Sequence, residues 1–289
     1  MPAYSLLLPV LRKLPPHWKT TLKRMAGYRR RKEIATSYTA PLVRRAHEWA
    51  WQDKEVANFY YRITPLNRDH LVQVISTVTG ASYDVIDGYM KELESDEALR
   101  RHIQDFLVRS KYGDDIVVEY GRRLGWYAFV RVMKPAVIIE TGVDHGVGAC
   151  VIASALLRNK QEGHNGRYYG TEIRTEAGRL FAGQYREVGE ILYGDSITSL
   201  EAFHQPIDIF INDSDHSADY EYREYLTVRQ KLSAGAYILG DNSHVTDSLS
   251  RFSRESGRSF VFFSEKPYEH WYPGAGIGIS YENRPRVSK

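Results

Sequence analysis

Seven short runs of apolar and β-branched residues follow one another along the second half of the chain, and amphipathic stretches separate most of them. The runs span residues 136–142, 167–173, 190–195, 207–213, 236–242, 259–265 and 276–282. Strands that alternate with helices are joined by crossover connections, which produce a mainly parallel sheet covered by helices on both faces. The sequence therefore predicts an α/β fold built on a mainly parallel seven-stranded sheet.

The residues before this pattern are expected to be mostly helical. The stretch 64–80 opens with Thr-Pro and closes on a glycine, whereas the stretch 95–113 opens with the predicted capping residue Ser95 and also closes on a glycine. These residues are typical start and stop signals of helices. We therefore predict three parts: a basic N-terminal arm at 1–34, a helical region at 35–125 and a ligand-binding α/β domain at 126–289.

The net charge of +3 is distributed unevenly along the 289 residues. Residues 1–33 carry nine Lys or Arg and one acid, Glu33, so they total +8 and the remainder totals −5. Together with nearby leucines, this charge suggests contact with an anionic membrane surface or a partner groove, and the alternative is a solvated arm. Nucleic acid is not expected as a partner, because the stretch lacks a binding motif and interleaved aromatic residues.

Other features of the composition limit the class of protein. No apolar run approaches the ~20 residues that a membrane-spanning helix needs, and the first residues lack the order of a secretory signal. A cytoplasmic location is therefore expected, and homo-oligomer formation is left open. The single cysteine, Cys150, excludes an intramolecular disulfide and a cysteine-built metal site.

Polar residues end the first five apolar runs. In parallel sheets of this kind, ligands bind beyond the carboxyl ends of the strands, near the point where the strand order reverses. We therefore expect one polar edge of the sheet to form a binding site. The residues at these ends are Glu140 and Gly142, Glu172, Asp195 and Ser196, Asp213 and Asp215, and Asp241 and Asn242.

The first turn, ETGVDHGVG at 140–148, is rich in glycine. Glycines let the chain turn tightly and let a ligand lie against the backbone at the start of the next helix. The turn lacks the strict Gly-x-Gly-x-x-Gly spacing of dinucleotide sites, since Asp144 stands in place of the middle glycine and would repel a pyrophosphate. Glu172 ends the next run, where a carboxylate can hold both hydroxyls of a ribose.

Several motifs in one order resemble those of class I S-adenosylmethionine-dependent methyltransferases: VIIETGVDHGVG, YYGTEI, YGDS, IDIFINDSDHS and LSAGAYILGDN. The resemblance covers roughly 125–285 and is greatest to metal-assisted O-methyltransferases that act on sugar hydroxyls. It implies a Rossmann-like fold with S-adenosylmethionine as cofactor. It also implies a role in cofactor binding for Glu140, Gly142 and Gly146 at the methionine part, Glu172 at the ribose, Asp195 and Ser196 near the adenine, and Asp213.

The resemblance further implies a metal site. In the metal-dependent relatives, an acid after the fourth strand and an acidic pair after the fifth bind magnesium, which corresponds to Asp213, Asp241 and Asn242. Two carboxylates and an amide oxygen suit a hard cation such as Mg²⁺ and leave positions for water or substrate hydroxyls. The alternative is that these acids cap helices and contact only the cofactor's amine.

Methyl transfer to a sugar hydroxyl also requires a base for the hydroxyl proton. Asp215 and His216 are the candidates from the loop after the fourth strand, and His244 is held in reserve. His216 is attractive because an imidazole titrates near working pH and nearby acids raise its basicity. The alternative for His216 is a loop histidine bound to a backbone carbonyl.

The sequence thus predicts an S-adenosylmethionine-dependent O-methyltransferase acting on a hydroxyl of a sugar, glycan or small natural product, with help from a metal. Two other classes stay open. An NAD-dependent oxidoreductase would share the fold but lacks the dinucleotide spacing. A non-catalytic binding protein on the same scaffold would explain the basic arm and Asn242, but it leaves Asp213, Asp215 and His216 without a purpose.

Overall fold

The computed structural model describes residues 15–51, 60–109, 116–241 and 243–282. Predictions that concern residues 1–14 or Asn242 therefore lie outside the described residues. The chain divides into two compact units, one of residues 1–52 with 269–271 and the other of residues 53–268 with 272–289. Each unit is considered by itself.

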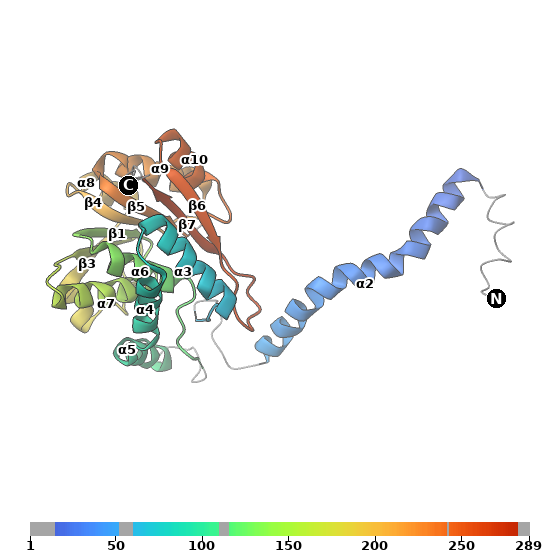
Figure 1. The fold of residues 1–289 in the computed structure, drawn as a ribbon, viewed down its shortest axis with the longest axis horizontal. Coiled ribbons are helices and arrows are strands. Elements are labelled where there is room, and N and C mark those ends of the chain that lie inside the picture. Colours follow the sequence, from blue (N-terminus) through green and yellow to red (C-terminus); the bar gives the residue numbers. More distant parts are fainter. Residues whose placement is uncertain (1–14, 52–59, 110–115, 242, 283–289) are drawn as a thin grey trace. The chain divides into compact units, whose positions relative to one another are not determined.

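The first unit consists largely of one helix, α2 (Pro16–Ala50), which runs without interruption through residue 34 (Figure 1). None of its side chains is buried, and Pro41 lies inside it, where a proline removes one helical hydrogen bond. Among the described residues, no helix combines the length and the apolar character needed to span a membrane.

Two helices form at the stretches 64–80 and 95–113, and the predicted end of the second at Gly113 lies outside the described residues. In α3 (Pro65–Thr79), the Thr64 side chain accepts a hydrogen bond from the Asn67 amide at 3.2 Å, and the helix ends at Gly80 in a left-handed conformation. Ser95 is not the cap of α5 (Glu97–Arg109). The carboxylate of Asp96 accepts the Leu99 amide at 3.0 Å instead, because it stands one residue closer to the first helical turn. The other N-terminal helices are α4 (Tyr83–Glu94) and α6 (Arg123–Met133).

The seven predicted strands all form and belong to one sheet, in the order β3-β2-β1-β4-β5-β7-β6. Strands β1 to β5 pair in parallel, whereas β7 pairs antiparallel with both β5 and β6. This arrangement confirms the predicted mainly parallel, Rossmann-like sheet. The strands are β1 (Val137–Thr141), β2 (Arg167–Glu172), β3 (Gly189–Tyr193), β4 (Ile207–Asn212), β5 (Leu232–Gly240), β6 (Ser259–Ser264) and β7 (Gly276–Tyr281).

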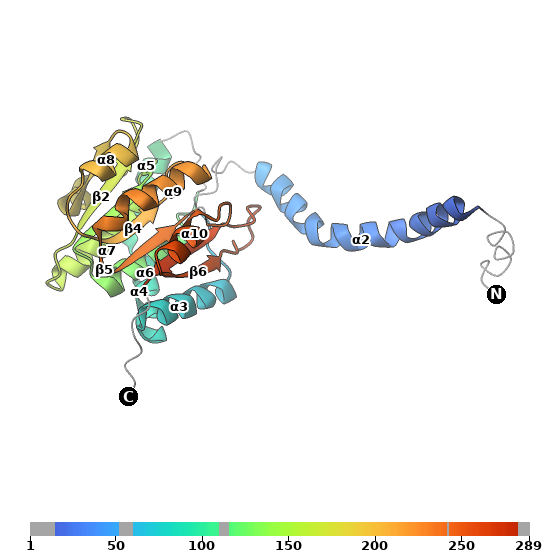
Figure 2. The ribbon, with the colours of Figure 1, turned by 90° about the horizontal axis from the view of Figure 1, so that it is seen from above.

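Helices cover both faces of this sheet (Figures 1 and 2). Alternate side chains of β1 enter two separate clusters, Ile138 on one face and Val137 and Ile139 on the other. The first face packs against α3 to α6 and α7 (Val147–Gln161). The second packs against α8 (Ser196–Ala202), α9 (Ala218–Val228) and α10 (Ser248–Glu255). Burial on both faces explains why these strands read as nearly continuous apolar runs.

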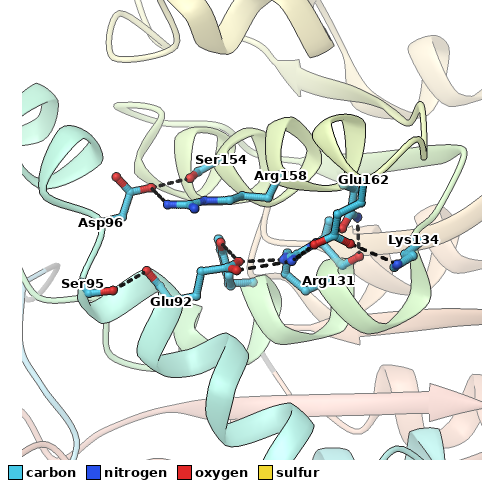
Figure 3. Close-up of polar contacts among 11 residues, drawn as sticks. Glu92, Ser95, Asp96, Arg131, Lys134, Ser154, Arg158 and Glu162 are labelled. Atoms are coloured by element: carbon cyan, nitrogen blue, oxygen red, sulfur yellow. Dashed lines mark hydrogen bonds and ion pairs between the residues drawn. The ribbon is translucent and has the colours of Figure 1, made fainter.

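A buried arginine joins the N-terminal helices to the sheet-covering helix α7 (Figure 3). Arg131 on α6 donates to Glu92 of α4 at 2.7 Å and to Glu162, just after α7, at 2.5 Å. It also donates to Asn159 on α7 and lies over the Tyr89 ring, 4.6 Å from its centre. Because removal of one partner leaves other charges buried and unpaired, such a cluster fixes how the three helices meet.

Candidate functional site

A cavity of about 520 Å³ opens at the carboxyl ends of the parallel strands. It lies beside β1 and β4, where the strand order reverses, as expected for this sheet type. Its volume falls within the range of small-molecule and cofactor sites. Most of the predicted cofactor residues line it: Glu140, Gly142, Glu172, Asp195, Ser196 and Asp213.

The glycine-rich turn after β1 brings the backbone close to the residue after β4. Gly142 has φ +84°, and a Cβ there would lie 2.0 Å from the Asp213 carbonyl oxygen. A Cβ on Gly148 would lie 2.5 Å from Oε1 of Glu140. Gly146 starts α7 in a left-handed conformation, but it is outside the set of residues that line the cavity. The tight turn is therefore as predicted. Gly146 lies at the start of α7, and its contact with a cofactor stays a prediction.

Glu140 is buried at the end of β1 and accepts a hydrogen bond from the Tyr168 hydroxyl. Burial raises the pKa of this carboxyl to about 8, against the lowering effect of Tyr168 and Arg123. In the ligand-free protein, Glu140 is therefore mainly protonated at neutral pH. A cationic ligand group placed beside it would favour its ionised form.

Glu172 organises the turn after β1 from the end of β2. Its carboxylate accepts the amide of Asp144 at 2.8 Å and that of Arg174 at 2.9 Å. Nη2 of Arg174 lies 2.6 Å from Oδ1 of Asp144. Burial opposes ionisation of Asp144, but Arg174 lowers its pKa below the ordinary value. The charge that was expected to repel a pyrophosphate is thus balanced by an arginine, which weakens that argument against a dinucleotide.

Asp195 and Ser196 form the next part of the cavity wall. Asp195 caps α8 by accepting the Thr198 amide at 2.8 Å, and its other oxygen accepts the Tyr220 hydroxyl at 2.6 Å. The hydrogen bond from Tyr220 holds the pKa of Asp195 below its ordinary value. Ser196 donates to the buried Glu224, which also accepts bonds from Asn212 and Ser214. These contacts hold the ends of β3 and β4 together.

Asp213 lines the floor of the cavity, whereas its neighbour Asp241 is outside the set of lining residues. Their amides continue the sheet ladder, since Asp213 donates to the Thr141 carbonyl and Asp241 to the Asn212 carbonyl, each at 2.9 Å. Burial and the neighbouring Asp241 raise the pKa of Asp213 well above its ordinary value. Burial opposes ionisation of Asp241 too, but Arg122 keeps its pKa low. The two shifts have opposite directions, so Asp213 favours its protonated form and Asp241 its ionised form.

The predicted magnesium ligands do not fit a cation in this arrangement. Arg122 donates to both carboxylate oxygens of Asp241, with a distance of 2.8 Å between Nη2 and Oδ2. Asn242 lies outside the described residues. Within the described ranges, no three His, Cys, Asp or Glu side chains gather as a metal site. Arg122 therefore competes with a cation for both oxygens of Asp241, which disfavours a hard cation there.

Two of the three candidate bases line the cavity, namely Asp215 and His216. Oδ1 of Asp215 accepts the Ser217 amide at 2.7 Å, which holds the pKa of Asp215 below its ordinary value and makes it the weaker base. His244 is outside the cavity lining, and its Nδ1 lies 3.3 Å from the Asp241 carbonyl oxygen. The backbone-carbonyl contact that was considered for His216 is thus found at His244.

Sequence reasoning missed the arginines of this site. Arg123 and Trp126, at the start of α6, line the cavity, as does Arg174. Arg122 lies behind its floor. The sequence contains one signal, since the pair Arg122 and Arg123 stands directly before the aromatic stretch LGWYAF, which belongs to α6. Their acidic partners are distant in sequence, so the pattern alone could not pair them.

Comparison with known proteins gives one family match. Residues 139–243 match the family model described as a methyltransferase domain. No curated protein sequence matches the chain significantly.

Three solved structures resemble the fold. A methyltransferase from Geobacter sulfurreducens is 16% identical, with coverage of 65% of this chain and 92% of that chain and a TM-score of 0.48. The O-methyltransferase TomG from Streptomyces achromogenes, in complex with SAM, is 16% identical, with coverage of 66% and 91% and a TM-score of 0.47. An SAH-bound methyltransferase from Podospora anserina is 17% identical, with coverage of 68% and 95% and a TM-score of 0.47.

Proposed function

We propose that this chain, whose residues 139–243 match the family model of a methyltransferase domain, transfers a methyl group from S-adenosylmethionine to a hydroxyl of a small acceptor. The observation that carries the proposal is the acidic cavity at the strand-order reversal. Four carboxyl side chains from the ends of four neighbouring parallel strands line it: Glu140, Glu172, Asp195 and Asp213.

This lining suits S-adenosylmethionine in charge and shape. The cofactor has a sulfonium and an ammonium at one end and a ribose and an adenine at the other. Glu140 and Asp213 meet the cationic end, since the pKa of both carboxyls is raised and a nearby positive charge favours their ionised forms. Glu172 accepts the ribose hydroxyls, and Asp195 with Ser196 lies against the adenine.

The acceptor approaches from the exposed side of the cavity, where Asp215 and His216 lie. The acceptor oxygen attacks the methyl carbon, the bond between carbon and sulfur breaks, and its electron pair stays on sulfur. The hydroxyl proton passes to the base. His216 is the better candidate because the Ser217 amide already stabilises the charged form of Asp215. A sugar, glycan or small natural product remains the proposed acceptor class.

Calorimetric titration of the full chain with S-adenosylmethionine, S-adenosylhomocysteine and NAD tests the cofactor. Saturable binding of the first two and none of NAD is expected. Binding of NAD alone would instead favour an oxidoreductase, and binding of none of them would refute the proposal. Screening of sugars and small phenols with labelled cofactor then identifies the acceptor. Saturable cofactor binding without label transfer to any of these hydroxyl acceptors would favour the non-catalytic alternative.

A further inference from the structure

Arg122 is a buried cation directly behind the floor of the cavity. It immediately precedes α6, and its Nε and Nη2 donate to the two carboxylate oxygens of Asp241. Its Nη1 donates to the Tyr61 hydroxyl at 3.0 Å. A planar guanidinium matches a carboxylate with two parallel hydrogen bonds, which fixes both position and orientation.

A second carboxylate contacts Arg122 from the other side. The Arg122 amide donates to Oε1 of Glu265 at 2.9 Å, and Nη1 lies 3.6 Å from Oε2 of the same residue. Glu265 follows β6, and its side chain is fully buried. Asp213 joins the group because its carboxyl is close enough to interact electrostatically with Arg122 and Asp241. Acids that follow β4, β5 and β6 therefore converge on one arginine.

Ionised acids in such a group destabilise the folded protein unless a positive charge lies beside them. In a metal-assisted enzyme, a divalent cation supplies that charge after β4 and β5. In this chain the guanidinium supplies it, because it occupies both oxygens of Asp241 and is itself held by Tyr61 and Glu265.

We propose that Arg122 takes the place of the divalent cation at this site, so that methyl transfer proceeds without a metal. The proposal rests on the function proposed above. Arg122 acts as a positioning residue, since it holds Asp241 and through it Asp213 at the cavity floor. With no cation to lower the acceptor's pKa, removal of the hydroxyl proton depends on the side-chain base alone.

Mn²⁺ titration of the full chain tests this directly. Binding is measured by electron paramagnetic resonance as the decrease of the free-ion signal. The wild-type chain should show no saturable site. Arg122→Met leaves Asp241 and Glu265 without their cation and should create one Mn²⁺ site, which a further Asp241→Asn substitution should remove. Arg68→Met is the matched control, because Arg68 pairs with Asp87 at 2.6 Å and with Glu94 at 2.8 Å, away from the cavity.

Each outcome decides the proposal. A wild-type Mn²⁺ site that Asp213→Asn abolishes would overturn it, whether or not the arginine variant folds. A folded Arg122→Met chain without a Mn²⁺ site would also overturn it, as would equal Mn²⁺ binding by Arg68→Met. Once the acceptor is known, turnover should be unchanged by chelator. Calorimetry with S-adenosylhomocysteine is a separate measurement, so failure of cofactor binding would refute the proposed function without altering the Mn²⁺ result.

Discussion

Replacement of Glu140 by Gln should change how the stability of the protein depends on pH. Burial raises the pKa of Glu140 from 4.5 to about 8 in the folded chain. The folded state therefore holds this proton more tightly than the unfolded state does. The stabilisation is complete below the unfolded pKa and is lost as the pH rises towards 8, by about 1.4 kcal/mol per pH unit.

Glutamine resembles the protonated carboxyl in shape and has no charge to bury. Glu140→Gln should therefore exceed the wild type by only about 1 kcal/mol at pH 5 and by about 3 kcal/mol at pH 7. Urea unfolding of the ligand-free chains at several pH values between 5 and 8 measures this difference. Glu176→Gln, a change at an exposed glutamate in the segment after β2, serves as the control. A difference between Glu140→Gln and wild type that stays constant from pH 5 to pH 8 would show that Glu140 is ionised throughout.

Three further substitutions test other parts of the site. Gly142→Ala should lower the unfolding free energy by about 3 kcal/mol, from left-handed strain together with overlap with the backbone after β4, whereas Gly163→Ala, with φ +88° and open space around it, should show only the strain of about 1–2 kcal/mol; equal losses in urea unfolding would argue against the close approach. Glu172→Ala should weaken S-adenosylmethionine binding by about 1–3 kcal/mol, and calorimetry that finds unchanged affinity in the folded variant would remove the ribose assignment. His216→Gln should lower turnover by about 10²–10⁴-fold with cofactor affinity unchanged, and Asp215→Asn should cost less; parent rates for both would place the base elsewhere.

The strands of the sheet could be predicted from the sequence because the pattern that marks each of them is local. Each parallel strand is a short apolar run that ends at a polar residue, and the polar residues after β1 to β5 mark one edge. The insertion of β7 between β5 and β6 could not be predicted in this way, since it depends on pairing between distant segments. The cap of α5 could not be predicted for a different reason. Ser95 and Asp96 are both good capping residues, and the backbone conformation decides between them.

The acids of the site could also be predicted, but their partners could not. Asp241 was identified from its place after β5, and a metal was inferred as its counter-charge. Arg122 lies 119 residues earlier in the chain, and no periodicity or motif links the two. Arg174 likewise changes the charge that Asp144 presents to a ligand. Charge compensation is a property of the folded neighbourhood, so a list of acids predicts where a positive charge is needed without predicting its source.

The position of α6 limits how this chain can be recombined with others. One end of the helix places Arg123 and Trp126 in the cavity wall, and the other end places Arg131 between α4 and α7. A chimera that kept residues 137–281 and took its helical region from another protein would lose part of the cavity wall. It would also leave Glu162 without its buried arginine. The helical region and the sheet are therefore not interchangeable modules. A change of acceptor specificity has to keep α6, because this helix contacts both the cavity and the other N-terminal helices.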